Sequence, residues 1–172
     1  METTQVAAAA AEITSGPIPA IATLWPDQGG RNGGLVRGID GGRDYFLIYA
    51  DDPAAEAELE WGGYGKDEPG AKSDHDGLAN TRVLIASEHD HPAAQFAGEA
   101  RIGGFSDWYL PARREWRVLV GNVPEAFKPD WYWSSTQYSR NGAWVQTFGV
   151  GLQDVGDKDD ARRVRLVRRL FL

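Results

Sequence analysis

The sequence contains no cysteine among its 172 residues. Disulfide bonds, thiolate metal sites and cysteine nucleophiles are therefore excluded, since each of them needs a thiol. Long apolar runs are also missing: no stretch approaches the ~20 apolar residues that cross a bilayer, so we expect no membrane insertion. The alanine run at residues 7–11 has no basic residue ahead of it and is a poor secretory signal. If the protein works outside the cell, we expect it to arrive there by another route, such as on an assembled particle.

Basic residues are fewer than acidic residues. Lysine and arginine number 18 against 25 aspartates and glutamates, which gives a formal net charge of −7. The electrostatic field of a net negative charge repels the phosphate backbone of nucleic acids, so no nucleic-acid partner is expected. The basic run near the end should instead pair with carboxylates of the same chain or of a neighbouring subunit. It comprises Arg162, Arg163, Arg165, Arg168 and Arg169.

Aromatic residues and turn formers are plentiful. The chain holds seven Trp, six Tyr and six Phe, together with 21 Gly and nine Pro. The aromatic rings can build a substantial core, while the glycines and prolines favour a loop-rich fold over a helix bundle. We expect a single domain over residues 25–172. Residues 1–24 are predicted to form an N-terminal extension, either a docking or oligomerising arm or a flexible terminus.

Hydrophobic periodicity places strands at both ends of the domain and helices between them. Residues 44–50 are aromatic and β-branched and predict a strand, with which the alternating stretch 58–64 is expected to pair. Helical spacing follows at residues 77–87, 92–101 and 112–120. The last third predicts strands at 131–138, 143–150 and 163–170, with Asn141-Gly142 as a hairpin turn. This order favours an α+β fold.

Four separated motifs resemble one known family. They are Asp-Gly-Leu-Ala-Asn-Thr at 76–81, Gly-Gly-Phe-Ser-Asp-Trp-Tyr-Leu-Pro at 103–111, Trp-Tyr-Trp-Ser-Ser-Thr at 131–136 and Val-Arg-Leu-Val-Arg at 164–168. From about residue 76 to the end, the chain is similar to the Lcl C-terminal domain family, a C-type-lectin-like group of bacterial surface and phage tail proteins. The resemblance implies a C-type-lectin-like fold, with two short helices packed on a small, mainly antiparallel sheet and an N-terminal extension.

The tryptophans in and around these motifs are expected to be core residues and not binding-site residues. Large aromatic side chains are usually buried in domains of this size, which predicts core positions for Trp108, Trp116, Trp133 and Trp144. Alternation along the strand at 131–136 puts Trp131, Trp133 and Ser135 on one face and Tyr132, Ser134 and Thr136 on the other.

A recognition surface is predicted at the hairpin in the last third. Tyr, Ser, Asn and Arg combine rigid aromatic area with adaptable hydrogen bonding, as binding surfaces require. The resemblance implies that this region lies near the ligand-facing side of a lectin-like fold. The alternative is that Asn141-Gly142 is a tight turn with a solvated rim. The candidate binding residues are Tyr138, Ser139, Arg140, Asn141, Trp144 and Gln146.

Metal binding and catalysis find little support in the sequence. The acidic stretch 153–160 lacks the ligand spacing of a calcium loop. The Glu-Pro-Asn and Trp-Asn-Asp motifs of calcium-dependent C-type lectins are absent, and His75, His89 and His91 do not form a spacing that compels a metal site. No nucleophile elbow or phosphate loop occurs, and the thiol chemistry of the related formylglycine-generating enzymes needs cysteine. We expect a protein without catalytic activity, cofactor or bound metal.

These observations favour a recognition module on a phage virion, as part of a tail fibre or adhesin. The expected partner is a bacterial surface polysaccharide or protein receptor, with other virion proteins bound through residues 1–24. A homo-oligomer, preferably a trimer, would raise the avidity of a weak contact. The alternatives are a structural virion or surface component that uses the fold for subunit contacts, and a secreted sugar-binding protein. The expected location is the virion, or alternatively the cell surface or extracellular space.

Overall fold

The computed structural model describes residues 16–172 and combines helices with strands. The helices are α1 (Gly77–Ala86), α2 (Pro92–Glu99) and α3 (Arg113–Asn122). The strands of the first half are β1 (Leu24–Trp25), β2 (Gly30–Val36), β3 (Tyr45–Tyr49) and β4 (Glu56–Glu60). Those of the last third are β5 (Trp131–Gln137), β6 (Gly142–Thr147), β7 (Gln153–Asp157), β8 (Ala161–Arg165) and β9 (Val167–Phe171).

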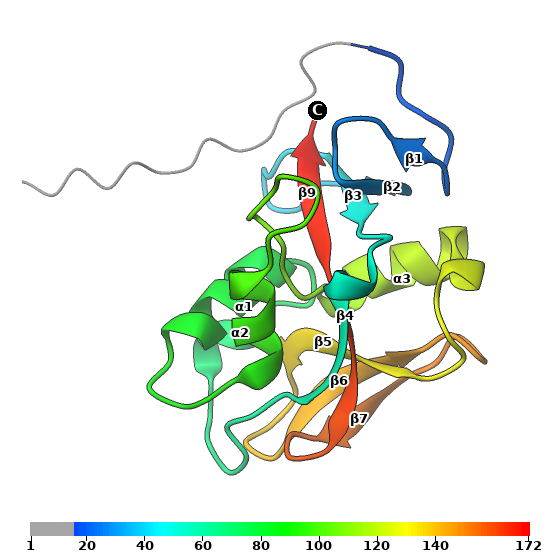
Figure 1. Ribbon diagram of the computed structural model, residues 1–172. Helices are drawn as coiled ribbons and strands as arrows, with labels where there is room; N and C mark the ends of the chain where they lie inside the picture. The colour runs from blue at the N-terminus through cyan, green and yellow to red at the C-terminus, as the bar shows by residue number, and fades with distance from the viewer. Residues whose placement is uncertain (1–15) are drawn as a thin grey trace, which may run out of the picture.

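The strands form two sheets, one above the other in Figure 1. The smaller sheet has the order β1-β2-β3-β9, and the larger has the order β4-β8-β5-β6-β7. Every strand pair is antiparallel except β5 with β8. Helices α1 and α2 lie on one side of the molecule and α3 on the other. The predicted α+β class is confirmed, but the described residues hold three helices and two sheets, not two helices and one sheet.

The stretch 163–170 was expected to be one strand, and this prediction was wrong. It is divided at Leu166 into β8 and β9, which belong to different sheets. The backbone of Leu166 leaves both ladders, because its N–H donates to Ala55 O and its carbonyl accepts from Ala50 N, each at 3.2 Å. No glycine or proline marks this point, so the alternating pattern runs straight across the break.

The expected pairing of residues 58–64 with 44–50 was also wrong. Strand β4 pairs with β8 and not with β3. In this register Glu58 lies opposite Arg163, and Glu56 lies opposite Arg165. Opposite charges facing each other across an antiparallel pair are stabilising, which favours this register over a shifted one.

The predicted helices are confirmed within a few residues, and local chemistry sets their starts. Asp76 caps α1 by accepting a hydrogen bond from Ala79 N at 3.0 Å. Pro92 occupies the first turn of α2, where its missing N–H costs nothing. The carboxylate of Glu115 reaches back to accept from Ala112 N at 2.8 Å at the start of α3.

The core is divided between the two faces of β5. Trp133 is fully buried on one side with Trp61, whereas Tyr132 packs on the other side with Trp116 and Phe127. The predicted alternation is therefore confirmed for Tyr132 and Trp133, as are the core positions of three tryptophans, Trp108, Trp116 and Trp133. It fails further along, because the pairing register shifts after Trp133 and Asn80 Nδ2 donates to the hydroxyls of both Ser135 and Thr136, which were expected on opposite faces. Trp144 differs from the expectation, because its side chain is only partly buried.

The predicted extension, residues 1–24, falls mostly on residues 1–15, which lie outside the described part of the chain. The described remainder is attached to the smaller sheet. Ala22 N donates to Asn32 O at 2.8 Å, and the side-chain amide of Asn32 donates to Pro19 O at 2.8 Å. Among the described residues, every helix is too short or too polar to cross a membrane.

Candidate functional site

The turn between β5 and β6 is closed by its own hydrogen bonds. The backbone N–H groups of Tyr138 and Ser139 both donate to Gly142 O at 3.0 Å. The hydroxyl of Ser139 accepts from Asn141 N at 3.3 Å and from Gly142 N at 3.1 Å. Ser139 therefore fixes the turn and is itself partly buried.

Two neighbouring loops hold this turn in place. Gly65 N donates to Arg140 O at 2.9 Å, and Arg140 Nε donates to Gly65 O at 3.2 Å. On the other side, Lys158 N donates to Asn141 O at 2.9 Å. The ammonium group of Lys158 is fully buried and donates to Gln137 Oε1 at 2.7 Å and Lys66 O at 2.8 Å. An internal cation thus joins the loops that flank the turn.

An aromatic and cationic cluster lies beside the turn. Tyr138 is 58% exposed, and its ring meets that of Trp144 edge-on with centroids 5.3 Å apart. The guanidinium of Arg113, the first residue of α3, lies 3.5 Å from the centroid of Trp144. Arg113 is held by Asp74 and Gln153, each at 3.1 Å. The cluster offers a partner an exposed ring, a stacked cation and a polar rim.

The structure brings most of the predicted binding residues to one surface. Tyr138, Arg140 and Asn141 are exposed, and Trp144 is partly so. Gln146 is the exception, because its side chain is 1% exposed and its amide donates to Thr147 O and Leu152 O. We therefore leave Gln146 out of the candidate surface, which we define as Arg113, Tyr138, Ser139, Arg140, Asn141 and Trp144.

Comparison with known families decides what kind of domain carries this surface. The Lcl C-terminal domain family matches residues 56–168, about two thirds of the chain. The chain belongs to the Lcl C-terminal domain family. The resemblance identified from the motifs is thereby confirmed, and with it a lectin-like module of a generally non-catalytic family. A search of the curated proteins found no match.

The motifs that identify this Lcl domain are mainly structural. Asn80 of α1 donates to Ser73 O at 2.7 Å and accepts from Ser73 N at 3.0 Å, which closes the loop before the helix. The hydroxyl of Thr81 accepts from Leu110 N at 3.1 Å. Arg168, which is fully buried, donates to both carboxylate oxygens of Asp107 at 2.7 and 3.1 Å. These contacts fasten the motif segments to one another.

The arginines of the basic run near the end of the chain form ion pairs with carboxylates, as predicted from the acidic composition of the chain. The ion pairs join Arg162 to Asp160, Arg163 to Asp130, Arg165 to Glu56, Arg168 to Asp107 and Arg169 to Asp76. All of these partners lie within the same chain.

Of the three histidines, His91 lies in the core. His91 is fully buried, with Nε2 2.9 Å from Glu68 Oε1 and Nδ1 3.1 Å from Trp61 O. Burial alone would raise the pKa of Glu68, but hydrogen bonds from Ser87 and His91 outweigh it and hold that pKa below its ordinary value. Within residues 16–172, no three His, Asp or Glu side chains are grouped as a metal would require.

Arg113 is the member of the surface that sequence reasoning missed. It precedes Trp144 by 31 positions, so no local pattern connects the two. A signal was nevertheless present, because Arg113 and Arg114 open a helix at the end where the macrodipole disfavours cations. Arginine at such a position indicates a role outside the helix, which here is stacking on an indole.

Proposed function

We propose that this Lcl domain is a non-catalytic recognition module of a phage virion, a tail fibre or adhesin, that binds a bacterial surface polysaccharide or protein. The observation that carries the proposal is the exposed ring of Tyr138 against Trp144, whose own ring is covered by Arg113. Aromatic anchors with a polar surround recur where proteins bind partners.

Rigidity of the surface supports the same function. The turn at Tyr138–Gly142 is closed internally and is joined by backbone hydrogen bonds to Gly65 and Lys158. A surface that is ordered before binding loses little conformational entropy on contact, which favours affinity. The buried ammonium of Lys158 contributes to this order, because it links the loops beside the turn.

The virion setting includes a trimer and a docking role for residues 1–24 toward other virion proteins. Three copies would present three recognition surfaces, and multivalency would raise the avidity of a weak individual contact. The support for this setting is the appended N-terminal segment and the family, together with a surface suited to a partner. Display on a cell surface or in the extracellular space is the alternative location.

The test measures binding of the labelled full-length protein to a panel of bacterial cells by flow cytometry. Arg140→Ala should weaken binding to a responsive strain roughly tenfold, because a guanidinium at a hot spot contributes about this much. Arg117→Ala provides the matched control, since Arg117 is exposed on α3 outside the candidate surface. Both variants should stay close to the wild-type melting temperature, because Arg140→Ala loses only the exposed side-chain bond to Gly65 O and keeps the backbone bond from Gly65 N to Arg140 O.

Three results would count against the proposal in different ways. Unaltered binding by Arg140→Ala would remove the candidate surface from recognition. Equal weakening by Arg117→Ala would indicate a general charge effect. Loss of binding on addition of a chelator would favour a calcium-dependent sugar-binding protein instead.

A further inference from the structure

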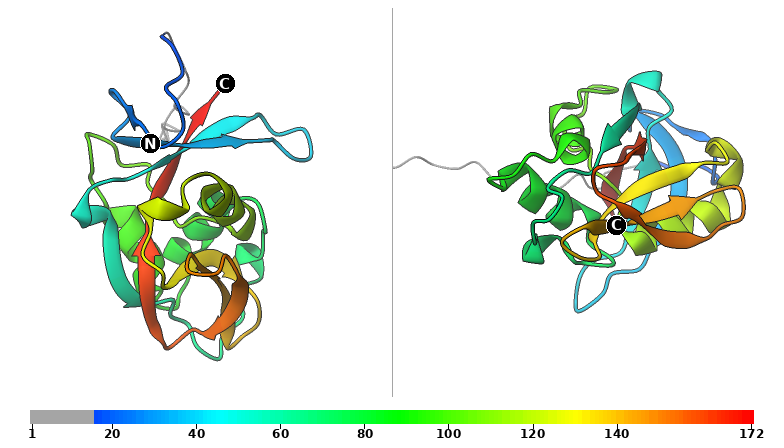
Figure 2. Two further views of the ribbon diagram at one scale, coloured as in Figure 1. Left: turned by 90° about the vertical axis from the view of Figure 1, so that its right-hand side faces the viewer. Right: turned by 90° about the horizontal axis from the view of Figure 1, so that it is seen from below.

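Two asparagine–glycine pairs lie at opposite ends of the molecule. Asn32 and Gly33 belong to β2 in the smaller sheet, whereas Asn141 ends the turn after β5 and Gly142 begins β6 in the larger sheet. The left view of Figure 2 shows β2 in the upper part of the molecule and the orange strands of the larger sheet in the lower part. Because the two pairs share the same dipeptide, a difference in their chemistry has to come from the fold.

An asparagine that precedes glycine carries a reactive amide beside an unshielded backbone nitrogen. That nitrogen can bond to the side-chain Cγ and close a five-membered succinimide, while the side-chain nitrogen leaves as ammonia and takes up the proton of the attacking N–H. Water then opens the ring to give aspartate or isoaspartate. The net reaction consumes water, releases ammonia and replaces a neutral amide with a carboxylate. Asparagine is labile in this sense, and glycine offers the attacking nitrogen least hindered by a side chain.

The surroundings of Asn141 leave its amide open to this reaction. Asn141 is exposed, and its side chain makes no hydrogen bond with another residue of the described part. The N–H of Gly142 donates to the hydroxyl of Ser139 at 3.1 Å. The glycine is also required by packing, because a Cβ at position 142 would lie 2.5 Å from Val155 Cγ1. The fold therefore keeps the reactive dipeptide at this turn and leaves its amide in solvent.

The surroundings of Asn32 have the opposite effect. Its side chain is 1% exposed, Nδ2 donates to Pro19 O at 2.8 Å and Oδ1 accepts from Gly34 N at 2.9 Å. Turning the amide toward the next backbone nitrogen would break both hydrogen bonds in a place that water does not reach, and unpaired buried polar groups are costly. The same dipeptide is therefore protected in β2.

We infer that Asn141 is a site of spontaneous deamidation, with water as the co-reactant, and that the reaction places a carboxylate on the candidate surface. The new charge follows Arg140 on the same exposed turn and offsets the charge of its guanidinium. An isoaspartate also adds a methylene to the backbone beside Asn141 O, which accepts from Lys158 N at 2.9 Å. The reaction itself is independent of the proposed function, whereas its effect on binding rests on that function.

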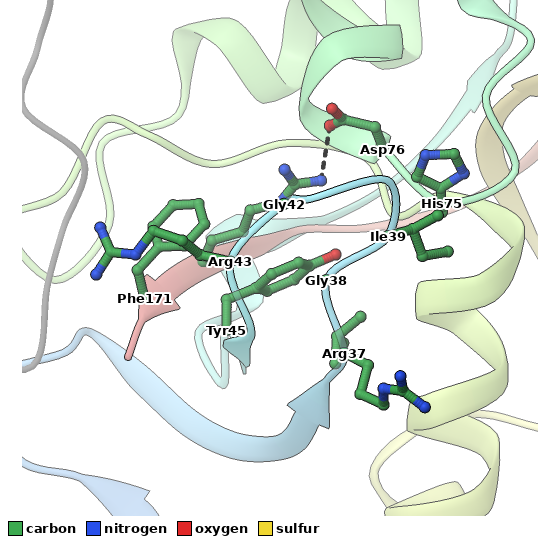
Figure 3. A pocket seen from close by; sticks show the side chains of 11 residues that line it. Arg37, Gly38, Ile39, Gly42, Arg43, Tyr45, His75, Asp76 and Phe171 are labelled. Atoms are coloured by element: carbon green, nitrogen blue, oxygen red, sulfur yellow. Dashed lines mark hydrogen bonds and ion pairs between the residues drawn. The ribbon is translucent and has the colours of Figure 1, made fainter.

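Aspartate–glycine pairs can close the same ring but do not change in mass, since the water lost is regained. Asp76, which precedes Gly77, is held by Arg169 at 2.7 Å and caps α1 (Figure 3). Asp40, which precedes Gly41, is exposed between β2 and β3. A change in peptide mass therefore reports on asparagine alone.

The test is a peptide map by mass spectrometry of the full-length protein, incubated for days at mildly alkaline pH and physiological temperature. The peptide that contains Asn141 should convert progressively to the aspartate and isoaspartate forms, while the peptide that contains Asn32 stays intact in the same sample. Conversion should be slower at mildly acidic pH, because the attacking nitrogen must lose its proton. An unchanged Asn141 overturns the inference. Equal conversion of Asn32 also overturns it, because the reaction would then follow the dipeptide and not the fold.

Asn141→Gln provides the matched control, because glutamine would have to close a six-membered ring, which forms far more slowly. After incubation, the wild type should bind responsive cells roughly tenfold more weakly than fresh protein, a loss similar to that expected for Arg140→Ala. Incubated Asn141→Gln should bind as well as its own fresh sample. Conversion without loss of binding, in a protein whose binding depends on Arg140, would overturn the effect on recognition. Binding that does not depend on Arg140 either would instead place the failure in the proposed function.

Discussion

Trp144 lies in a different environment from the tryptophans of the core. Arg113 covers its ring at 3.5 Å and Tyr138 meets it edge-on, whereas Trp133 is fully buried and donates from Nε1 to Leu59 O at 2.9 Å. The face of an indole carries negative potential, so a guanidinium stacked there is stabilised. This stacking orders Trp144 without removing all of it from solvent.

The two tryptophans should therefore respond differently to truncation. Trp133→Ala should lower the free energy of unfolding by about 3–5 kcal/mol, the range for large buried aromatics. Trp144→Ala should lower it by roughly 2 kcal/mol, because less apolar area is lost from contact with the core. Urea denaturation of both variants measures the difference. Equal losses would show that Trp144 is a core residue.

Lys158 gives the protein a distinctive pH response. Burial lowers its pKa from the ordinary 10.5 to about 8, while Glu68 and Asp67 act in the opposite direction. Between these values the unfolded chain holds a proton that the folded chain has released, so stability from this group rises with pH. The rise begins near pH 8 and is complete above the unfolded pKa.

Replacement of Lys158 isolates this effect. The wild type should gain up to about 1.4 kcal/mol per pH unit relative to Lys158→Met as the pH increases from 8 to 10, because methionine does not titrate. Urea midpoints of the two proteins at pH 8, 9 and 10 provide the measurement. Parallel curves would mean that the ammonium of Lys158 is not desolvated in the folded protein.

At the scale of whole elements, α3 is tied to the smaller sheet through one buried carboxylate. Glu115 is fully buried and accepts hydrogen bonds from Tyr45 OH and Tyr109 OH at 2.7 Å, and from Arg169 at 3.2 Å. Burial, together with the charge of Glu115, raises the pKa of Tyr45 well above its ordinary value, so its hydroxyl remains a donor. Helix α3 and strands β3 and β9 thus share a single acceptor.

Glu115→Gln should weaken this junction. The amide keeps the shape of the carboxylate but removes its charge and points N–H groups at existing donors, so we expect a loss of about 3 kcal/mol in unfolding free energy. Glu125→Gln, at an exposed position after α3, should change it by less than about 0.5 kcal/mol. Chemical denaturation compares the two. Similar stabilities would contradict the shared-acceptor arrangement.

The helices and strands also show which structural features can be predicted from the sequence. Helices α1, α2 and α3 were predictable because Asp76, Pro92 and the periodic apolar positions act within one or two turns. Strand pairing was not, since β4 finds its partner about a hundred positions later in β8. The division at Leu166 was equally hidden, because alternation says which face a residue takes and not which sheet it joins.

The candidate surface likewise has a part that could be predicted from the sequence and a part that could not. Tyr138 to Asn141 could be predicted, since a hairpin signal and its residue types are local. The side-chain amide of buried Gln146 donates to Leu152 O, and the stacking of Arg113 on Trp144 depends on α3 packing across β5 and β6. Neither contact is encoded in one segment alone.

At the scale of the whole molecule, the Lcl domain presents a rigid turn supported by two sheets and three helices in its described part. The central claim is that the surface around Tyr138 and Trp144 remains open in the assembled protein and is covered by an external partner. A subunit contact would bury the same rings in the assembly itself, so solvent access to these rings separates the two possibilities.

Oxidative footprinting of Tyr138 and Trp144 measures this access most directly. It should be carried out on the full-length protein as purified, alone and with cells of any strain that binds it in the flow-cytometry test. We predict that Tyr138 is readily oxidised in the free protein and protected when cells are bound, while the buried Trp133 reacts slowly in both. Protection of Tyr138 already in the free protein would contradict an open recognition surface.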